Sequence, residues 1–225
     1  KININHYRIS SSLFSLASDF TDDLTIDLQK LSNYQEILNK IRSIGVIARQ
    51  NSVTLSIYPD STNSLMSDDD SVIERTIKEL NFHSWFLDTA GFPSNAANPI
   101  IIKPNYEPTK EDHNTVVKCV QKFYKNFEKL SEETQNRLVI QNESSGYWNA
   151  VKLFQYFHVY LHEKFDKGMV LSYYNVADER NPSKLGSTSD VEPVVNIGAF
   201  HETWRGVVPI FLWSEKKGAT SNSSV

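Results

Sequence analysis

The chain has 225 residues, with 27 acidic against 23 basic side chains and a formal net charge of −4. This balance counts against strong binding to duplex DNA, which usually needs a basic surplus, but it leaves room for a local basic face. No apolar run approaches the roughly 18 residues that span a bilayer, and no signal-peptide pattern opens the chain. We therefore expect a soluble, intracellular protein that binds no membrane.

Six short segments rich in β-branched or aromatic residues are the predicted strands. They are residues 7–9, 53–58, 99–103, 137–141, 168–174 and 208–213. Several of them are apolar on both faces, as in a sheet that is covered by helices.

Four segments with apolar residues three and four positions apart are the predicted helices. They are residues 27–50, 71–89, 111–130 and 148–165. In the second of them, Asp70 or Ser71 is the predicted N-cap and Gly91 the stop.

Strands and helices alternate without hairpin signals, which predicts right-handed crossovers and a parallel α/β sheet. Six such units fit a barrel or a doubly wound sheet. The chain lacks the Gly-rich dinucleotide fingerprint and the Walker loop, and this absence favours a TIM-type (β/α) barrel. We expect residues 1–215 to form one domain and the small polar residues 216–225 to form a flexible tail.

Residues 6–18 read HYRISSSLFSLAS. They resemble the second barrel strand of the ultraviolet-damage endonucleases, which runs Tyr-Arg-Ile-Ser-Ser and then Leu-Phe-Pro-Leu-Ala-Ser-His. Further blocks resemble the family in the same order, at residues 55–59, 80–83, 137–143, 203–204 and 209–214. The resemblance gives counterparts to family strands two through seven, and none to the first and eighth. It therefore implies a barrel that is incomplete within this chain.

The resemblance implies a metal-dependent phosphodiesterase that nicks DNA on the 5′ side of lesions, with divalent ions that are usually manganese. Such chemistry needs His and carboxylate ligands at the carboxyl ends of barrel strands. The aligned ligand positions hold other residues here: Asp19, Tyr58, Lys103, Gln141, Ser172, Asn175, Ile210 and Leu212. Since loss of two or more ligands normally abolishes a transition-metal site, we expect no metal cofactor and no catalytic residue at these positions.

Other aligned positions carry further expectations. The family's lesion-probing Gln-Tyr pair becomes Ser61 and Thr62, while Asp19 and Glu143 remain as candidate acids for a rebuilt magnesium site. We also expect Lys103 to pair with Glu143 or Asp19 across the old metal cavity.

Histidines and tryptophans carry weaker signals. His158 and His162, four residues apart on a predicted helix, are expected to be solvated or to face a partner, and His83 to be packed. Trp148, Trp204 and Trp213 could stack on bases, although tryptophans in or beside strands are more often core residues.

The leading hypothesis is a family member that has lost phosphodiesterase activity and serves as a binding or structural module. Its partner would be DNA or other proteins in an assembly. The alternative is an active DNA repair endonuclease with a rebuilt carboxylate site. A third hypothesis is another metal enzyme with the same barrel, such as a sugar isomerase. The lack of His and carboxylate ligands counts against it as well. The Asn-, Ser-, Lys- and Ile-rich composition fits an AT-rich genome, so the chain could be virus-encoded or virion-associated.

Overall fold

A six-stranded parallel sheet runs through the part of the chain that the computed structural model describes, namely residues 6–10, 31–142, 147–174 and 211–213. Its strands are β1 (His6–Ser10), β2 (Thr54–Tyr58), β3 (Ile100–Ile102), β4 (Leu138–Gln141), β5 (Val170–Tyr174) and β6 (Phe211–Trp213). Each strand pairs in parallel with the next one in the chain. The six predicted strands are confirmed.

The helices follow the strands in alternation. They are α1 (Tyr34–Gln50), α2 (Asp70–Thr89), α3 (His113–Phe127) and α4 (Glu132–Arg137), then a last helix of three parts, α5 (Ala150–Leu153), η3 (Phe154–Tyr160) and α6 (Leu161–Phe165). The middle part η3 is a π-helix, and α4 was not predicted. Residues 27–30 of the first predicted helix lie outside the described residues.

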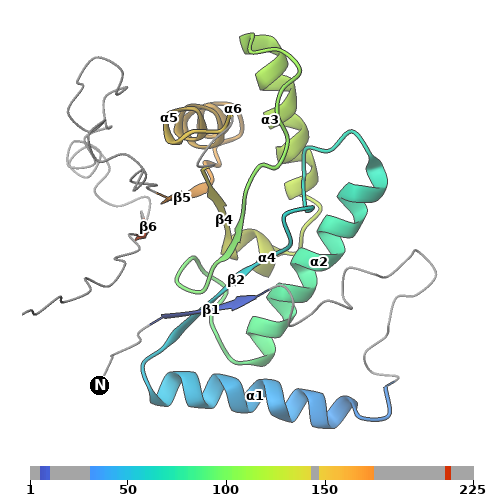
Figure 1. The fold of residues 1–225 in the computed structure, drawn as a ribbon, viewed down its shortest axis with the longest axis vertical. Coiled ribbons are helices and arrows are strands. Elements are labelled where there is room, and N and C mark those ends of the chain that lie inside the picture. The colour runs from blue at the N-terminus through green and yellow to red at the C-terminus, as the bar shows by residue number, and fades with distance from the viewer. Residues whose placement is uncertain (1–5, 11–30, 143–146, 175–210, 214–225) are drawn as a thin grey trace, which may run out of the picture.

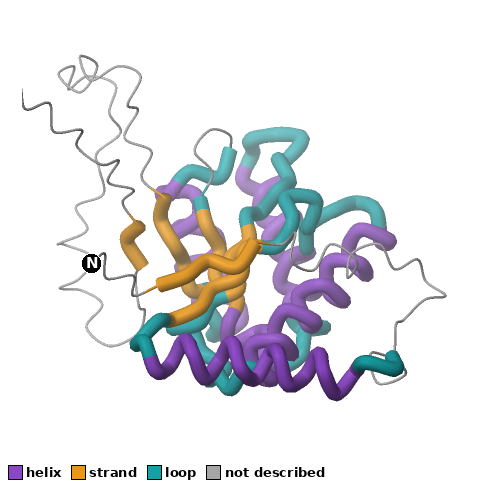
Figure 2. The backbone as a smooth tube through the Cα atoms, turned by 60° about the horizontal axis from the view of Figure 1, so that its bottom comes forward, coloured by secondary structure: helices purple, strands orange, loops and turns teal. Residues whose placement is uncertain are grey.

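The order of the strands distinguishes between the two expected architectures. A doubly wound sheet reverses its strand order at a switch point, whereas here the order is β1-β2-β3-β4-β5-β6 throughout. Right-handed crossovers that always lead to the next strand place the helices on one face of the sheet. Figure 1 shows α1, α2, α3 and α5–α6 in an arc around the strands, and Figure 2 shows the strands gathered on one side of the helices. This is the winding of a (β/α) barrel wall; that the barrel is incomplete within this chain remains a prediction.

The second helix begins one residue earlier than predicted. Asp69 is its N-cap, and the Asp69 carboxylate accepts hydrogen bonds from the backbone N–H and the hydroxyl of Ser71. The proposed caps Asp70 and Ser71 are therefore the first two helical residues. In a run of three aspartates, backbone geometry decides which one takes the extended cap conformation. Gly91 follows the C-cap residue Ala90. The φ angle of Gly91 is 80°, a left-handed conformation that glycine adopts readily, so the predicted helix stop at Gly91 is confirmed.

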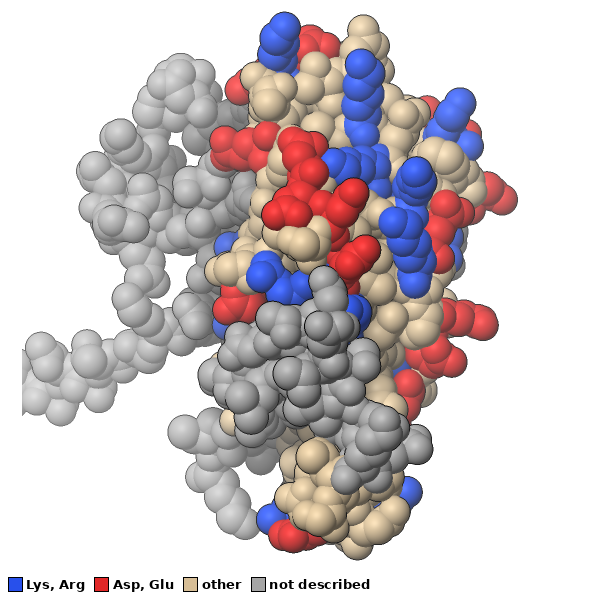
Figure 3. All heavy atoms as spheres, turned by 90° about the vertical axis from the view of Figure 1, so that its right-hand side faces the viewer, with Lys and Arg blue, Asp and Glu red and all other residues tan. Residues whose placement is uncertain are grey.

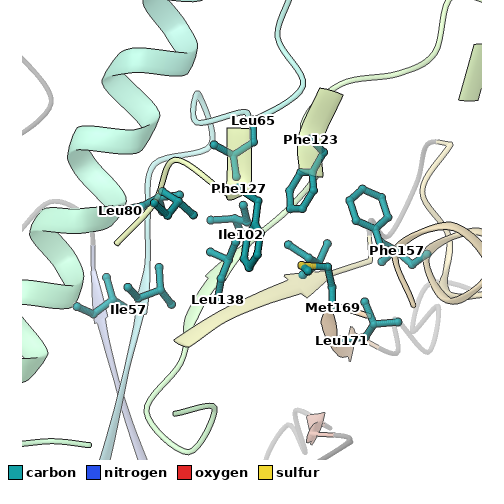
Figure 4. Close-up of a cluster of buried hydrophobic side chains, with 14 of the residues drawn as sticks. Ile57, Leu65, Leu80, Ile102, Phe123, Phe127, Leu138, Phe157, Met169 and Leu171 are labelled. Atoms are coloured by element: carbon teal, nitrogen blue, oxygen red, sulfur yellow. The ribbon is translucent and has the colours of Figure 1, made fainter. Parts of the chain in front are cut away.

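One hydrophobic core joins the sheet to the helices. Alternate strand residues point into it, and the fully buried Ile57, Ile100 and Ile140 come from three neighbouring strands. Phe123 and Phe127 of α3 belong to the same core and point toward Ile102 of β3 (Figure 4). Burying each such side chain is worth about 1.5–3 kcal/mol.

The alternate strand residues on the opposite face of the sheet are mostly polar where β1 and β2 pair. We call this surface the inner face. On these strands its residues are His6, Arg8, Ser10, Thr54, Ser56 and Tyr58. On β3 and β4 the same alternation gives it Ile101, Val139 and Gln141. The functional side chains described below belong to the inner face.

A buried guanidinium links the segment just before β4 to the end of α2. Arg137 has no exposed surface, and it donates hydrogen bonds of 2.7 Å to the Ser84 hydroxyl, the Asp88 carboxylate and the backbone carbonyl of Phe92. Asp88 is partly exposed, but removing the guanidinium would leave the buried acceptors at Ser84 and Phe92 without this donor, at a cost of about 1–3 kcal/mol. Arg137 thus has a structural role at the amino end of the sheet.

Two expectations about aromatic side chains are wrong. Trp148 is fully buried and donates its indole N–H to the Tyr106 carbonyl oxygen at 2.6 Å, so it is not available to stack on bases. His158 is buried, with Nδ1 3.2 Å from the Met169 carbonyl oxygen, while His162 is 51% exposed, as a solvated histidine should be. Tertiary packing overrides the helical spacing in both cases. Trp204 and the side chain of Trp213 lie outside the described residues.

The contact between α1 and the end of α2 leads to a first prediction. Gly45 lies in the buried stripe of α1, and a Cβ atom there would be 1.7 Å from the Ala90 carbonyl oxygen. Gly45→Ala should therefore lower the free energy of unfolding by about 1–3 kcal/mol, as overpacking does. An exposed helical glycine would instead gain about 0.5–1 kcal/mol from the same change. Urea denaturation measures the difference, with the exposed Ser43→Ala as control; an unchanged or raised midpoint for Gly45→Ala would contradict this packing.

Burial of His158 leads to a second prediction, on pH. Burial, the main cause, and the nearby His162 lower the pKa of the His158 imidazole below its usual 6.5. The unfolded chain then binds more protons than the folded one, so stability should fall as the pH drops below about 6.5. Urea denaturation at several pH values should show a shallower fall for His158→Gln than for the wild type or the exposed His162→Gln. Equal slopes in all three proteins would show that His158 does not carry the effect.

Candidate functional site

The site lies on the inner face, near the edge where the parallel strands end. Tyr58 is the last residue of β2 and Gln141 the last residue of β4. The Tyr58 hydroxyl donates a hydrogen bond of 2.6 Å to Oε1 of Gln141. Since β3 lies between these strands, the bond crosses two strand spacings of about 4.8 Å each. It joins two of the positions that the family resemblance assigns to metal ligands.

Arg8 lies against the same tyrosine. Its guanidinium carbon is 4.5 Å from the centroid of the Tyr58 ring, within the range of a cation–π contact. The register of β1 on β2 places Arg8 beside Ser56 and Ser10 beside Tyr58. Arg8 is exposed, so the contact holds the tyrosine ring while the guanidinium still reaches solvent.

His6 lies further down the inner face, away from the carboxyl edge. Its Nδ1 is 2.7 Å from the Thr54 hydroxyl oxygen, and its Nε2 is 2.8 Å from the Ser56 hydroxyl oxygen. Burial lowers the pKa of the His6 imidazole, so the ring stays neutral over a wider pH range than a free histidine. Both ring nitrogens therefore have hydroxyl partners within the sheet.

Lys103 follows the last residue of β3. Ile102 is paired with Ile140, so continuing the same register places Lys103 beside Gln141. Burial alternates along this segment: Ile101 and Lys103 are half-buried, while Ile102 is buried in the core, which puts Lys103 on the inner face. The expected partners Glu143 and Asp19 lie outside the described residues, and the pairing stays a prediction.

The aligned lesion-probe positions, Ser61 and Thr62, lie in an exposed turn after β2. The turn is held by hydrogen bonds: the Asp60 carboxylate accepts the Thr62 N–H at 2.8 Å, and Glu79 accepts the Asp60 N–H at 3.4 Å. Asp60 therefore has a structural use in this turn.

Glu79 of α2 accepts the hydrogen bond from the Asp60 backbone N–H of that turn. Its Oε1 is 3.3 Å from Nε2 of His83, and both side chains are buried, so the expectation of a packed His83 is confirmed. Burial alone would raise the pKa of the Glu79 carboxyl, but hydrogen bonds from His83, Asn63 and the Asp60 backbone hold it below its usual value. The spacing of four residues between Glu79 and His83 was the sequence signal for this pair.

The remaining aligned positions are placed only in part. Ser172 pairs by backbone register with Gln141 on one side and Phe211 on the other, and Leu212 pairs with Tyr173. Four more lie outside the described residues: Asp19, Glu143, Asn175 and Ile210. Arg8 was not predicted as a site residue, although strand alternation already placed it on the same face as Tyr58.

The described side chains do not fit a bound dication. The Tyr58 hydroxyl and the Gln141 amide are neutral and bond to each other, while Lys103 brings a positive charge. Within the described parts of the chain, no group of three or more His, Cys, Asp or Glu side chains could hold a metal ion. Manganese-type sites depend on carboxylate and imidazole ligands, and these positions supply neither.

The outer helix surface carries charges of both signs. Three lysines, Lys118, Lys122 and Lys125, lie on α3, and Lys129 follows it. Asp68 accepts bonds from Lys122 at 2.8 Å and from the Tyr106 hydroxyl at 2.6 Å, which raises the pKa of Tyr106 to about 12. Figure 3 shows acidic and basic side chains mixed over this face. It therefore lacks the separated basic stripe of a strong duplex-DNA surface.

The described helices include none that is long and apolar enough to cross a membrane.

A parallel α/β sheet wound in one direction, with its polar site at the strand ends, is the architecture of barrel enzymes and their relatives. The chain belongs to the UV-endonuclease UvdE family, whose model matches residues 1–206. A UV DNA damage endonuclease of Clostridium perfringens is 26% identical over 149 residues, which cover 65% of this chain and 32% of the relative. A UV-damage endonuclease of Schizosaccharomyces pombe is 22% identical over 228 aligned positions, covering 99% of this chain and 34% of the relative.

Two further comparisons found similar proteins. A relative from Acanthamoeba polyphaga mimivirus is 28% identical over 145 residues, which cover 64% of this chain and 41% of the relative. The crystal structure of SacUVDE superposes with a TM-score of 0.59 at 20% identity, over 97% of this chain and 65% of that one. The solved structure supports the fold. The chain spans 32–41% of the length of the curated relatives that it matches.

The Tyr58–Gln141 bond leads to a third prediction. Tyr58→Phe leaves the nearly buried Gln141 amide without this donor, which should cost about 1–3 kcal/mol of unfolding free energy. In a double-mutant cycle with Gln141→Met, the coupling energy should be about 0.5–1.5 kcal/mol. Urea denaturation of the four proteins measures it, with Tyr7→Phe, at a 60% exposed tyrosine, as control. Additive effects of the two changes would mean that the bond does not form in solution.

Proposed function

We propose that this chain is a UV-endonuclease family member that has lost metal-dependent phosphodiesterase activity and acts as a binding module for DNA. The observation that carries the proposal is the hydrogen bond of 2.6 Å between Tyr58 and Gln141, two positions assigned to metal ligands by the family resemblance. A closed bond between neutral groups occupies the place where charged ligands would be needed.

Metal-assisted hydrolysis depends on the charge of the ligand set. The ions activate a water molecule and stabilise the negative oxygens of the phosphate, and carboxylates keep those ions bound. Gln141 keeps the shape of a glutamate without its charge. Lys103 beside it would repel a dication in this low-dielectric setting. Both changes act in the same direction, against a bound metal.

DNA is the proposed partner on two grounds. The similar proteins of Clostridium perfringens and Schizosaccharomyces pombe are named as endonucleases of damaged DNA. In addition, the inner face carries two cations, Arg8 in the middle of β1 and Lys103 just after the carboxyl end of β3, the end at which barrel proteins bind their ligands. Cations without a carboxylate ligand set favour binding of an anion over its hydrolysis. A protein partner in an assembly is the competing possibility.

The test compares binding with nicking on the same DNA. The 225-residue chain should bind irradiated or single-stranded DNA in EDTA, and should not nick irradiated plasmid when Mn²⁺ or Mg²⁺ is added in excess. The Clostridium perfringens endonuclease in the same assay is the positive control for nicking. Nicking above the buffer blank would contradict the loss of activity. Absence of DNA binding in gel-shift assays would overturn DNA as the partner.

If nicking did occur, two substitutions would identify its source. The alternative of a rebuilt site assigns the metal to Asp19 and Glu143. Asp19→Asn and Glu143→Gln should then each abolish the activity, whereas a trace of contaminating nuclease would be unaffected by them.

A further inference from the structure

We propose that Arg8 and Lys103 bind phosphate groups directly, so that the inner face recognises a polyphosphate anion, such as a nucleic-acid strand, without any metal. This inference rests on the proposed function and gives the binding module its recognition chemistry. The observation behind it is that the inner face carries two cations without a carboxylate partner among the described residues, while Tyr58 and Gln141 bond to each other.

Arg8 contacts the Tyr58 ring and has no ion-pair partner among the described residues. Its guanidinium packs 4.5 Å from the centre of the Tyr58 ring, and the Tyr58 hydroxyl is fixed in turn by Gln141. A guanidinium stacked on an aromatic ring by its face keeps its edge N–H groups free to donate outward. That edge matches two phosphate oxygens at once, which is why arginine is common in phosphate recognition.

Lys103 supplies the second cation from β3's carboxyl end. The register places it beside Gln141, on the same face as Arg8 but two strands away. Two strand spacings amount to about 10 Å, and by the register Lys103 lies four residues further along the strands than Arg8, roughly another 13 Å, so the backbone positions are further apart than one phosphate group spans. The two side chains therefore suit an anion with several phosphates better than a single phosphate ion.

The charges of Arg8 and Lys103 are not matched by the described acids. Some other basic residues of the described chain have carboxylate partners: Lys40 binds Glu36, Lys122 binds Asp68, and Arg137 binds Asp88. None of the ion pairs among the described residues includes Arg8 or Lys103. A phosphate ligand would supply the missing negative charge.

The phosphate need not be hydrolysed for this recognition. In place of a dication that polarises the phosphate, the site offers a fixed guanidinium and an ammonium, which stabilise bound charge but generate no nucleophile. Binding of this kind should be strongly salt-dependent, since each phosphate contact on a single strand contributes a slope of about −0.7 in log K against log salt.

The experiment removes the charges of Arg8 and Lys103 together and compares this double variant with one that lacks two charges elsewhere on the surface. Arg8→Gln/Lys103→Gln is matched by Arg42→Gln/Lys40→Gln, which removes the same two charges from the outer helix α1. A fluorescent single-stranded oligonucleotide in EDTA is titrated with each protein and followed by anisotropy, and inorganic triphosphate is used as competitor. Urea midpoints check that every variant is folded.

We expect the site variant to bind the oligonucleotide at least about tenfold more weakly than wild type, because two charge-assisted hydrogen-bonding groups are removed. Its salt slope should be less negative by about 0.7 for each phosphate that the variant no longer neutralises. The control variant should change affinity by less than about twofold, and Arg8→Lys should keep part of the binding, since it preserves charge but not the bidentate edge. Triphosphate should displace the oligonucleotide from the wild type.

The other outcomes separate this inference from the proposed function. If the site variant binds the oligonucleotide as well as the wild type does, the phosphate site is wrong while the DNA-binding function stands. If triphosphate binds through Arg8 and Lys103 but the oligonucleotide does not bind, the phosphate site stands and DNA as the partner is wrong. A wild-type chain that binds neither ligand overturns both.

Discussion

The one-directional winding of the sheet constrains everything else in this molecule. Because each crossover leads to the next strand, the described helices and the apolar core lie on one face of the sheet, and none of these helices covers the inner face. Its polar groups must then find partners among themselves. His6 does so with Thr54 and Ser56, and Tyr58 does so with Gln141. The site is thus a consequence of how the strands are connected.

The same constraint explains how a catalytic centre can be lost while the fold remains. A metal ion at the strand ends neutralises and links the side chains around it, and without it those groups would be left unpaired. Tyr58 and Gln141 form one hydrogen bond between neutral groups instead. Burying a hydrogen-bonded polar pair costs far less free energy than burying polar groups without partners. The core does not depend on the site, because Ile57 and Ile140 point to the opposite face. Fold and chemistry are therefore separable here.

Much of the fold could be predicted from the sequence because it depends on local periodicity. The six strands follow from short β-branched runs, and the family blocks follow from contiguous motifs. The site could be predicted only in part. The bond from Tyr58 to Gln141 joins residues 83 positions apart, and knowing it requires the strand register. Trp148 and His158 were misjudged because three-dimensional packing, not helical spacing, sets their burial. Arg8 could have been predicted as a site residue, since alternation along β1 places it on the face opposite the buried Ile9.

The most direct test of the proposed loss of the metal site is a titration of the purified, EDTA-treated 225-residue chain with Mn²⁺ by isothermal calorimetry, repeated with Mg²⁺. We predict no stoichiometric binding at micromolar ion concentrations, because the described ligand positions offer neutral and positive groups. A one-to-one site with micromolar or tighter affinity would contradict this prediction. That result would mean that acidic residues such as Asp19 and Glu143 have rebuilt a metal centre beside the Tyr58–Gln141 pair.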